Sequence, residues 1–436
     1  MKNSEGLARA QPQQACRRSD KFKYFLKSTN PAKKAPLCKG GWPVQSTGPG
    51  DCLINNFCIC KDGFKGQIMK IYNARVFIDK EFVPGGVEFT DKFTACGSEI
   101  ADGDIDAGGA YLIPGLVDIH THAAMGEDSS DGRPEGIPVM GRYYAKGGVT
   151  SWCPTTMTLK EPELISAMHA IRSYRRPKDG AKTAGIHLEG PFVSYAKRGA
   201  QNAENLHAPD IDMFNRLNEA SGGMVRLITI APEEPGAMEF IKEVSKVCTV
   251  SLGHTTADYD TAKAAYEAGA SHATHLYNAM PSLLHRAPGV IGAAFDCNAT
   301  AELICDGIHV HPGAVRIAFE LFKDNLVLIS DSLRCAGMPD GEYMLGGQPI
   351  TLKNGRATLK DSDTIAGSCI HLMDALKKAV NFGLPLETAV YAATAAPAKA
   401  IRRDDIGAVA CGKCADFVLL DEELNVKAVY IDGVQI

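Results

Sequence analysis

The chain has 436 residues, of which 45% are hydrophobic and 22% charged, enough for a barrel-sized core and a smaller second domain. Its formal net charge of −5 argues against a surface for nucleic acid, and no apolar run approaches the roughly 20 residues that span a bilayer. The N-terminus also lacks the basic-then-apolar order of a signal peptide. We therefore expect a cytoplasmic protein that binds neither nucleic acid nor membranes.

Residues 1–68 differ in composition from the rest of the chain. They hold 9 Lys and 3 Arg against 4 acidic residues and are rich in Pro, Gly, Ser and Gln. Such a segment cannot bury enough apolar surface to offset its ordering entropy, which predicts a disordered basic tail. An alternative is metal binding by its cysteines, which are Cys16, Cys38, Cys52, Cys58 and Cys60. Because the first methionine after Met1 is Met69, the functional protein could also begin there.

Short β segments near both ends of the remaining chain predict one small domain. Met69–Phe77 has the pattern of a strand, as do Ala415–Leu420 and Val426–Ile431 near the C-terminus. A Gly at position 433, preceded by Asp, gives a turn signal after the last of them. We expect a small β-sandwich domain built from residues 69–114 and 404–436.

The region between these ends, residues 115–403, has the pattern of a barrel. Eight apolar runs occur in order: Leu116–Ile119, Val149–Cys153, Ala184–Leu188, Val225–Ile230, Val250–Leu252, His272–Leu276, Leu303–Cys305 and Leu326–Ile329. Between them, apolar residues recur at helical spacing in Glu161–Tyr174, Gly236–Val247, Ala257–Ala268 and Gly313–Lys323. Eight strand–helix repeats predict an α/β protein with a (β/α)8 TIM-like barrel.

Seven of the eight runs end in, or run directly into, a residue that can bind a ligand. In chain order these are His120 with His122, the softer Thr155 and Thr156, Glu189, His254, His275, His309 and Asp331. Because the C-terminal ends of barrel strands meet at one mouth, these side chains should converge although they are far apart in the sequence.

The His120-Thr-His122 motif suggests a metal site. Residues i and i+2 of a strand face the same side, so both imidazoles can reach one ion. A lone motif of this kind is more often a satisfied histidine pair, but Glu189, His254 and His275 supply a second ligand set. Nitrogen mixed with carboxylate suits borderline metals. We expect one or two divalent ions per subunit, with zinc or iron favoured.

Asp331 follows an apolar run and has two interpretations. It could cap the next helix or pair with a cation. The functional interpretation is a general base beside a water molecule that a metal ion activates, with the same carboxyl later protonating the leaving amine.

A further set of residues suits an anionic, hydroxylated substrate. Asn278 and Ala279 follow His275, and Arg286 comes shortly after. A guanidinium can bond two phosphate oxygens at once, although a single loop arginine is usually a solvated charge. His309, close to Asp306 in a loop-like stretch, could bond a sugar hydroxyl or the acyl oxygen.

Several motifs carry a family resemblance over Met69 to Ile436. They include Pro-Gly-Leu-Val-Asp-Ile-His-Thr-His ending at His122, Gly-Ile-His-Leu-Glu-Gly-Pro-Phe ending at Phe192, and Thr-Ile-Ala-Gly-Ser ending at Ser368. With these motifs the chain resembles the N-acetylglucosamine-6-phosphate deacetylase family of the amidohydrolase superfamily. The resemblance implies hydrolysis of an N-acetyl amide, giving glucosamine 6-phosphate and acetate, in amino-sugar catabolism by a homodimer.

The resemblance also implies roles for individual residues. Glu189, His254 and His275 match the principal metal ligands, His120 and His122 the extra pair of two-metal members, and Asp331 the catalytic acid/base. The candidate substrate-binding positions are Ala200, Gln201, Asn278, Ala279, Arg286, Asp306, His309, Ile365, Ala366 and Gly367.

Two positions depart from the family pattern. Gln201 stands where the family often has His, and glutamine cannot carry a proton. Ala123–Gly126 stands where a Gly-rich loop is usual.

Two alternatives to this function remain open from the sequence. One is a sister amidohydrolase acting on N-acetylgalactosamine 6-phosphate or an N-acyl amino acid. The other is a non-catalytic sugar-phosphate binding protein on the same scaffold.

Overall fold

The computed structural model describes residues 57–59, 65–360 and 362–436. The predicted tail at 1–68 and its cysteines therefore lie largely outside the described residues. Of that segment, β1 (Phe57–Ile59) pairs antiparallel with β2 (Lys65–Gln67). Among the described helices, none has the length and apolar character needed to cross a bilayer.

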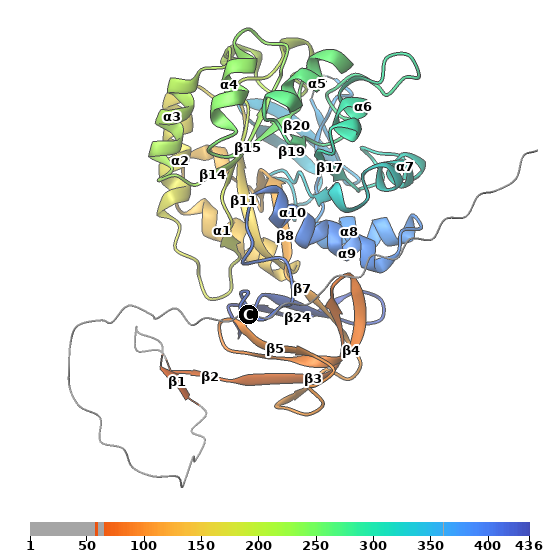
Figure 1. Cartoon of the computed structure of the whole chain (residues 1–436). Coiled ribbons are helices and arrows are strands. Elements are labelled where there is room, and N and C mark those ends of the chain that lie inside the picture. The colour runs from red at the N-terminus through yellow and green to blue at the C-terminus, as the bar shows by residue number, and fades with distance from the viewer. Residues whose placement is uncertain (1–56, 60–64, 361) are drawn as a thin grey trace, which may run out of the picture. The chain divides into compact units, whose positions relative to one another are not determined.

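Eight parallel strands form the barrel and follow one another in chain order around it. Several of them are labelled in Figure 1. They are β8 (Leu116–Thr121), β11 (Val149–Thr156), β13 (Ile186–Glu189), β14 (Val225–Ile230), β15 (Thr249–Leu252), β16 (His272–Ala273), β17 (Thr300–Ile304) and β18 (Leu326–Ile329). The last strand returns to the first, where the Asp331 N–H donates to the His120 carbonyl at 2.9 Å. The predicted (β/α)8 fold is confirmed, and each of the eight apolar runs contains or overlaps one of these strands.

Ten α-helices lie in the described part of the chain, most of them on the outside of the barrel strands (Figure 1). They are α1 (Gly136–Lys146), α2 (Glu161–Ser173), α3 (Ile211–Ala220), α4 (Ala237–Val244), α5 (Tyr259–Ala268), α6 (Gly289–Asp296), α7 (Pro312–Phe322), α8 (Leu372–Asn381), α9 (Leu386–Ala393) and α10 (Ala395–Ala400). N-terminal capping side chains stabilise the first turn of several of these helices; for example, Asp258 accepts from the Thr261 N–H at the start of α5. Apolar faces of these helices pack on the strands in one large core that contains Trp152.

The loop after β8 forms a tight hairpin. β9 (Ala123–Ala124) pairs with β10 (Glu127–Asp128), and the turn residues Met125 and Gly126 have φ of 56° and 84°. Only one of these two positive-φ positions is a glycine, so this loop does not need the usual Gly-rich sequence.

A four-stranded antiparallel sheet follows β18, and the sequence analysis did not predict it. Its strands are β19 (Gly341–Leu345), β20 (Gln348–Lys353), β21 (Arg356–Leu359) and β22 (Ile365–Gly367). It has an apolar cluster of its own that also includes Met157 and Ala200. This sheet places Ile365–Gly367 beside the barrel mouth.

The small domain combines strands from both ends of the described chain. Its sheet has the order β25-β24-β23-β7-β3-β4-β5, with β6 added to β3. The bounds are β3 (Met69–Ile78), β4 (Glu81–Phe89), β5 (Phe93–Gly97), β6 (Ile105–Asp106), β7 (Tyr111–Pro114), β23 (Phe417–Leu420), β24 (Val426–Ile431) and β25 (Val434–Gln435). The Phe93 and Phe417 ring centroids are 5.8 Å apart although their strands are not neighbours. The sheet therefore folds back over its own core.

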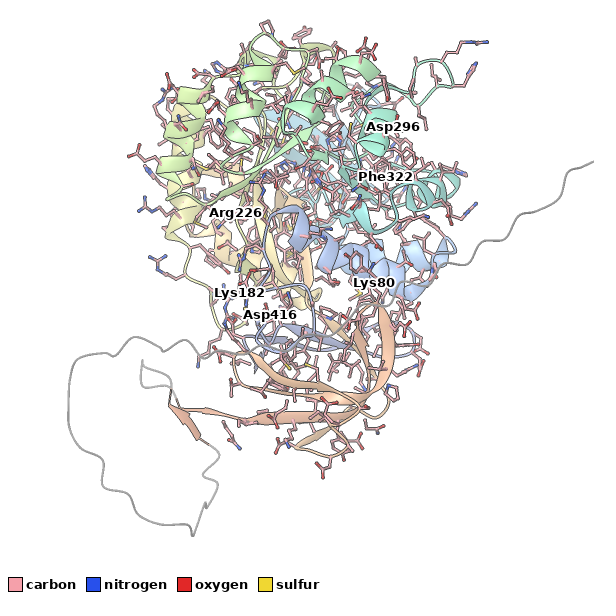
Figure 2. All side chains as sticks on the ribbon, viewed as in Figure 1. Lys80, Lys182, Arg226, Asp296, Phe322 and Asp416 are labelled. Carbon is pink, nitrogen blue, oxygen red and sulfur yellow. The ribbon has the colours of Figure 1, made fainter. Side chains whose placement is uncertain are left out.

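Polar contacts join the small domain to the barrel. The ammonium of Lys182 lies 2.8 Å from Asp416 and 2.6 Å from Asp432, and Lys182 and Asp416 are labelled in Figure 2. The Gly115 N–H, directly before β8, donates to the Asp416 carbonyl at 2.9 Å. The first barrel strand is thereby fixed to the C-terminal strands.

Candidate metal-dependent active site

The candidate ligands lie where barrel strands end. His120 is in β8 and Glu189 ends β13, while His254, His275 and Asp331 follow β15, β16 and β18 by two residues each. All of them are buried. His254, His275 and Asp331 have φ of 48°, 27° and 49°, a left-handed conformation that is costly for residues other than glycine. Such strain persists where surrounding structure imposes it, and it gathers at functional sites.

Glu189, His254 and His275 form the first ligand group. The Glu189 Oε1 lies 3.0 Å from the Nε2 of each histidine, and the two Nε2 atoms are 3.0 Å apart. The ligand atoms of a tetrahedral zinc ion, at about 2.0–2.1 Å from the metal, lie about 3.3 Å from one another. The spacing of this group therefore suits a shared cation.

The hydrogen bonding of His254 gives an independent reason to expect a cation. Its Nδ1 lies 2.9 Å from the Lys197 carbonyl oxygen, which can only accept, so Nδ1 carries the proton. In the neutral ring, Nε2 then presents a lone pair to the carboxylate oxygen of Glu189. Lone pairs that converge in a buried place repel one another unless a positive charge lies between them, so these residues fit a divalent metal.

His120, His122 and Asp331 form a second group beside the first. The Asp331 Oδ1 lies 3.7 Å from the His120 Nε2 and 3.4 Å from the His122 Nε2. His122 also approaches Glu189, with its Nε2 3.3 Å from Oε2. Within each group the ligand atoms lie within 4.8 Å of one another. The ligand residues expected from the sequence are thus brought together, with Asp331 beside His120 and His122.

The electrostatic field in this region favours positive charge. Burial opposes a charged His122 ring, yet hydrogen bonds to Asp331 and Glu189 raise its pKa to about 9. Burial likewise opposes charge on His120, but the carboxylates of Glu302 and Glu189 raise its pKa well above the usual value. Burial would raise the pKa of Glu189, and the neighbouring histidines lower it well below its usual range instead.

A cavity of about 480 Å³ opens beside the two groups. Its lining includes most of the predicted substrate positions, namely Ala200, Gln201, Asn278, Ala279, His309, Ile365, Ala366 and Gly367. Asp331 and His122 also line it, so the candidate acid/base has access to a bound molecule.

Asp306 lies directly behind His309. The Asp306 Oδ2 is 2.7 Å from the His309 Nδ1, and its Oδ1 accepts from the backbone N–H groups of Ile308 and His309 at 2.8 Å. This carboxylate fixes the ring of His309, whose side chain reaches the cavity wall. Asp306 therefore orients a cavity residue and is not part of the cavity lining itself.

Arg286 has a different environment. It is exposed and lies beside its neighbour His285, with 2.7 Å between Arg286 Nη1 and His285 Nε2. It does not belong to the cavity lining of its own chain. Its contact with a substrate stays a prediction.

Gln201 lies between Glu189 and the loop after β11. Its Nε2 donates to Glu189 Oε2 at 2.6 Å, and its Oε1 accepts from the Thr158 N–H at 2.7 Å. This pairing fixes the amide orientation and turns the residue toward the ligand group.

Some residues of the site were not predicted from the sequence. The cavity lining also contains Met157, Lys197, Arg356, Asp363 and Thr364, two of them basic. Behind the ligands, Glu302 and His272 form a buried polar pair. Glu302 places a charge inside the otherwise apolar strand β17, and this irregularity is the sequence signal that could have pointed to it.

The fold and the converging His, Glu and Asp side chains define a barrel hydrolase with groups that can hold a divalent metal. Residues 111–436 match the amidohydrolase family, and the chain belongs to that family.

Individual relatives narrow this class. The chain is 37% identical over 328 residues to the N-acetylglucosamine-6-phosphate deacetylase of Bacillus subtilis (strain 168), covering 73% of this chain and 82% of that protein. It is 34% identical over 327 residues to the N-acetylgalactosamine-6-phosphate deacetylase of Escherichia coli O157:H7, covering 74% and 86%. The crystal structure of N-acetyl-D-glucosamine-6-phosphate deacetylase from Mycobacterium smegmatis matches with a TM-score of 0.79 at 32% identity, covering 84% of this chain and 100% of that one.

Proposed function

We propose that this chain hydrolyses the N-acetyl amide of N-acetylglucosamine 6-phosphate to glucosamine 6-phosphate and acetate, in amino-sugar catabolism. The proposal is supported by relatives of that name, one of them matched over 82% of its length. The observation that carries it is the convergence of Glu189, His254 and His275 next to Asp331 at the wall of one cavity.

Glu189, His254 and His275 would hold one divalent ion, and His120, His122 and Asp331 offer ligand atoms for a second. Nitrogen and carboxylate ligands favour zinc or iron. When bound, such an ion lowers the pKa of a water molecule toward about 7 and polarises the acyl carbonyl.

Asp331 carries the proton transfers in this proposal. Its carboxylate takes a proton from the water oxygen as that oxygen bonds to the acyl carbon. The carbon–nitrogen bond then breaks, and Asp331 delivers the proton to the departing sugar nitrogen. Atoms balance, because one water molecule is consumed and the products are the amine and acetic acid, which releases its remaining proton to become acetate at neutral pH.

The remaining cavity residues would bind the sugar phosphate. His309, held by Asp306, offers a ring nitrogen to a hydroxyl or to the acyl oxygen. Lys197 and Arg356 add positive charge to the cavity wall, which suits a phosphate. Arg286 would contribute from its exposed loop if the protein is a homodimer, as we propose from the family resemblance.

The test is acetate release from purified protein, with N-acetylglucosamine 6-phosphate and its galacto epimer as separate substrates. Asp331→Asn should reduce turnover at least about 10²-fold while the ion held by Glu189, His254 and His275 stays bound. The matched control is Asp296→Asn, because Asp296 is exposed and only accepts from the Tyr259 hydroxyl at 2.7 Å.

Each outcome decides between named functions. Faster turnover of the galacto epimer would favour the alternative function, an N-acetylgalactosamine-6-phosphate deacetylase, which the Escherichia coli relative supports. No acetate release from either epimer by metal-loaded protein would reject deacetylation and favour a non-catalytic binding protein. Near-normal turnover of Asp331→Asn would remove Asp331 from its role.

A further inference from the structure

Glu302 is a fully buried carboxylate in the middle of β17, and the reaction proposed above does not use it. It does not line the cavity. Burying an ionised carboxylate is costly unless hydrogen bonds and positively charged partners compensate for the lost hydration. A residue kept at this cost inside an apolar strand calls for a specific explanation.

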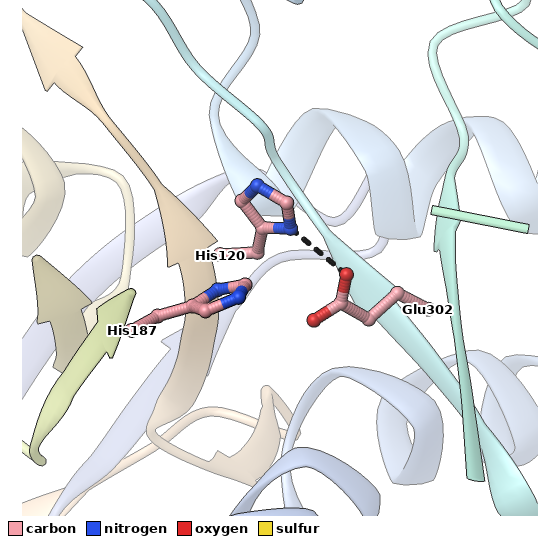
Figure 3. Close-up of side chains that lie close together, drawn as sticks. All are labelled: His120, His187 and Glu302. Atoms are coloured by element: carbon pink, nitrogen blue, oxygen red, sulfur yellow. Dashed lines mark hydrogen bonds and ion pairs between the residues drawn. The ribbon is translucent and has the colours of Figure 1, made fainter. Parts of the chain in front are cut away.

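The contacts of Glu302 lead directly to the candidate ligands. Its Oε2 lies 2.8 Å from the His120 Nδ1 and accepts from the His275 backbone N–H at 3.1 Å. Its Oε1 lies 3.2 Å from the His272 Nε2. Figure 3 shows the carboxylate of Glu302 facing the ring of His120.

The short contact determines which nitrogen of His120 carries the proton. A carboxylate can only accept, so the His120 Nδ1 is protonated and donates to Glu302. The Nε2 of the neutral ring is then free, and it points to the other side, 3.4 Å from Glu189 and 3.7 Å from Asp331. Among the described residues it has no hydrogen-bond partner.

Packing keeps the ring of His120 in this orientation. The ring of His187 meets it edge-on, with centroids 4.5 Å apart and planes inclined by 78° (Figure 3). His187 is itself held by a 2.8 Å contact between its Nε2 and the Thr229 hydroxyl. His120 therefore has little freedom to turn its free nitrogen away from Asp331.

We propose that Glu302 is a positioning residue, which holds His120 as the Nδ1–H tautomer and so prepares its Nε2 to bind a second divalent cation with His122 and Asp331. The proposal rests on the proposed metal-dependent function. Carboxylates placed behind metal-binding histidines orient the ring and raise its basicity, and their loss typically costs about 10- to 100-fold in metal affinity.

The most informative variant is Glu302→Gln. Its side-chain oxygen can still accept from the His120 ring and the His275 N–H, so the backbone around the first group keeps its hydrogen bond. The variant loses only the negative charge of Glu302 and the hydrogen bond that the His272 Nε2 can donate to its Oε1. Folding is checked by circular dichroism and the melting temperature.

The measurement is zinc bound per chain at equilibrium with buffered free zinc, read by elemental analysis. We expect two ions in the wild type, and in Glu302→Gln an unchanged first ion with the second requiring about 10- to 100-fold more free zinc. The matched control is Thr300→Val, which removes the 2.6 Å contact with the His272 Nδ1 but leaves Glu302 and His120 in place. Its binding curve should equal that of the wild type.

A double variant tests whether Glu302 acts through His120. In a His120→Ala background, which lacks the second ion, Glu302→Gln should leave the remaining zinc curve unchanged. A further shift of the zinc curve in this double variant would overturn the proposal. So would a Glu302→Gln protein that loses both ions equally or binds zinc like the wild type. A wild type that binds a single ion would overturn it as well. If zinc binding follows the expected pattern but no acetate is released, deacetylation fails and the role of Glu302 stands.

Discussion

The side-chain amide of Gln201 donates to the Oε2 of Glu189 at 2.6 Å, on the side away from the oxygen that faces His254 and His275. One oxygen of this carboxylate thus accepts from an amide, while the other faces the imidazoles of His254 and His275. Gln201, which departs from the pattern expected from the family resemblance, therefore bears on the candidate metal ligand Glu189.

Replacing Gln201 should weaken metal binding. In Gln201→Ala the Oε2 of Glu189 loses its donor, so the carboxylate is less well fixed, and we expect about a 10-fold loss of zinc affinity in competition with a chelator. The control is Asn202→Ala, the next residue, whose side chain only accepts from the Glu204 N–H. Unchanged zinc affinity in Gln201→Ala would show that the contact does not matter for the metal.

Replacing Asp306 should affect the substrate and leave the metal in place. Burial alone would raise the pKa of Asp306, but hydrogen bonds with His309 and its backbone lower it, so the carboxylate stays ionised at neutral pH. Asp306→Asn loses a charge-assisted bond worth about 1.5–3 kcal/mol, and kcat/KM should fall by about 10-fold or more. Steady-state kinetics with metal analysis of the same samples checks this. Equal kcat/KM in both proteins would contradict it.

Removing metal should destabilise the folded chain. An ion that binds only the folded state, at 100 times its dissociation constant, adds about 2.7 kcal/mol to the free energy of unfolding. A chelator should therefore lower the melting temperature, and added zinc should restore it. Magnesium should restore less, because it prefers oxygen ligands. A melting temperature that ignores the chelator would argue against a tightly bound ion.

The ion pair between Arg403 and Asp405 should stabilise the folded chain at neutral pH, and this stabilisation should disappear in acid. Arg403 binds both oxygens of Asp405, at 2.6 and 2.7 Å, and this hydrogen bonding lowers the pKa of Asp405 to about 2. Because the pKa of Asp405 is lower in the folded state, the contribution of the ion pair to the free energy of unfolding is complete above pH 3.8. It is lost as the pH falls toward about 2.

Asp405→Asn should therefore cost about 1 kcal/mol at pH 7, since the pair is partly exposed. The difference from the wild type should shrink between pH 3.8 and about 2. Urea unfolding of both proteins at several pH values measures it. A difference that stays constant through this range would show that the ion pair is not its source.

The barrel and its ligand groups were predictable because they depend on a repeated pattern. Each strand is an apolar run, and Glu189, His254 and Asp331 come at the ends of such runs, so barrel geometry alone brings them together. The role of His275 follows from the same rule.

Other features depend on tertiary contacts that no local pattern encodes. The direction of the loop at Arg286 and the pairing of Gln201 with Glu189 are set by neighbours distant in the sequence. The sheet β19–β22 is an insertion outside the strand–helix repeat. The tail at 1–68 and the limits of the two domains stay predictions.

The bond between the Asp331 N–H and the His120 carbonyl has a consequence for synthesis of the chain on the ribosome. Histidines of the first strand emerge some two hundred residues before the aspartate that they face. A nascent chain that ends short of β18 has an open sheet and only part of the ligand set. Capture of a second ion and catalytic competence should therefore both arise late, once the seam between the first and last strands has closed.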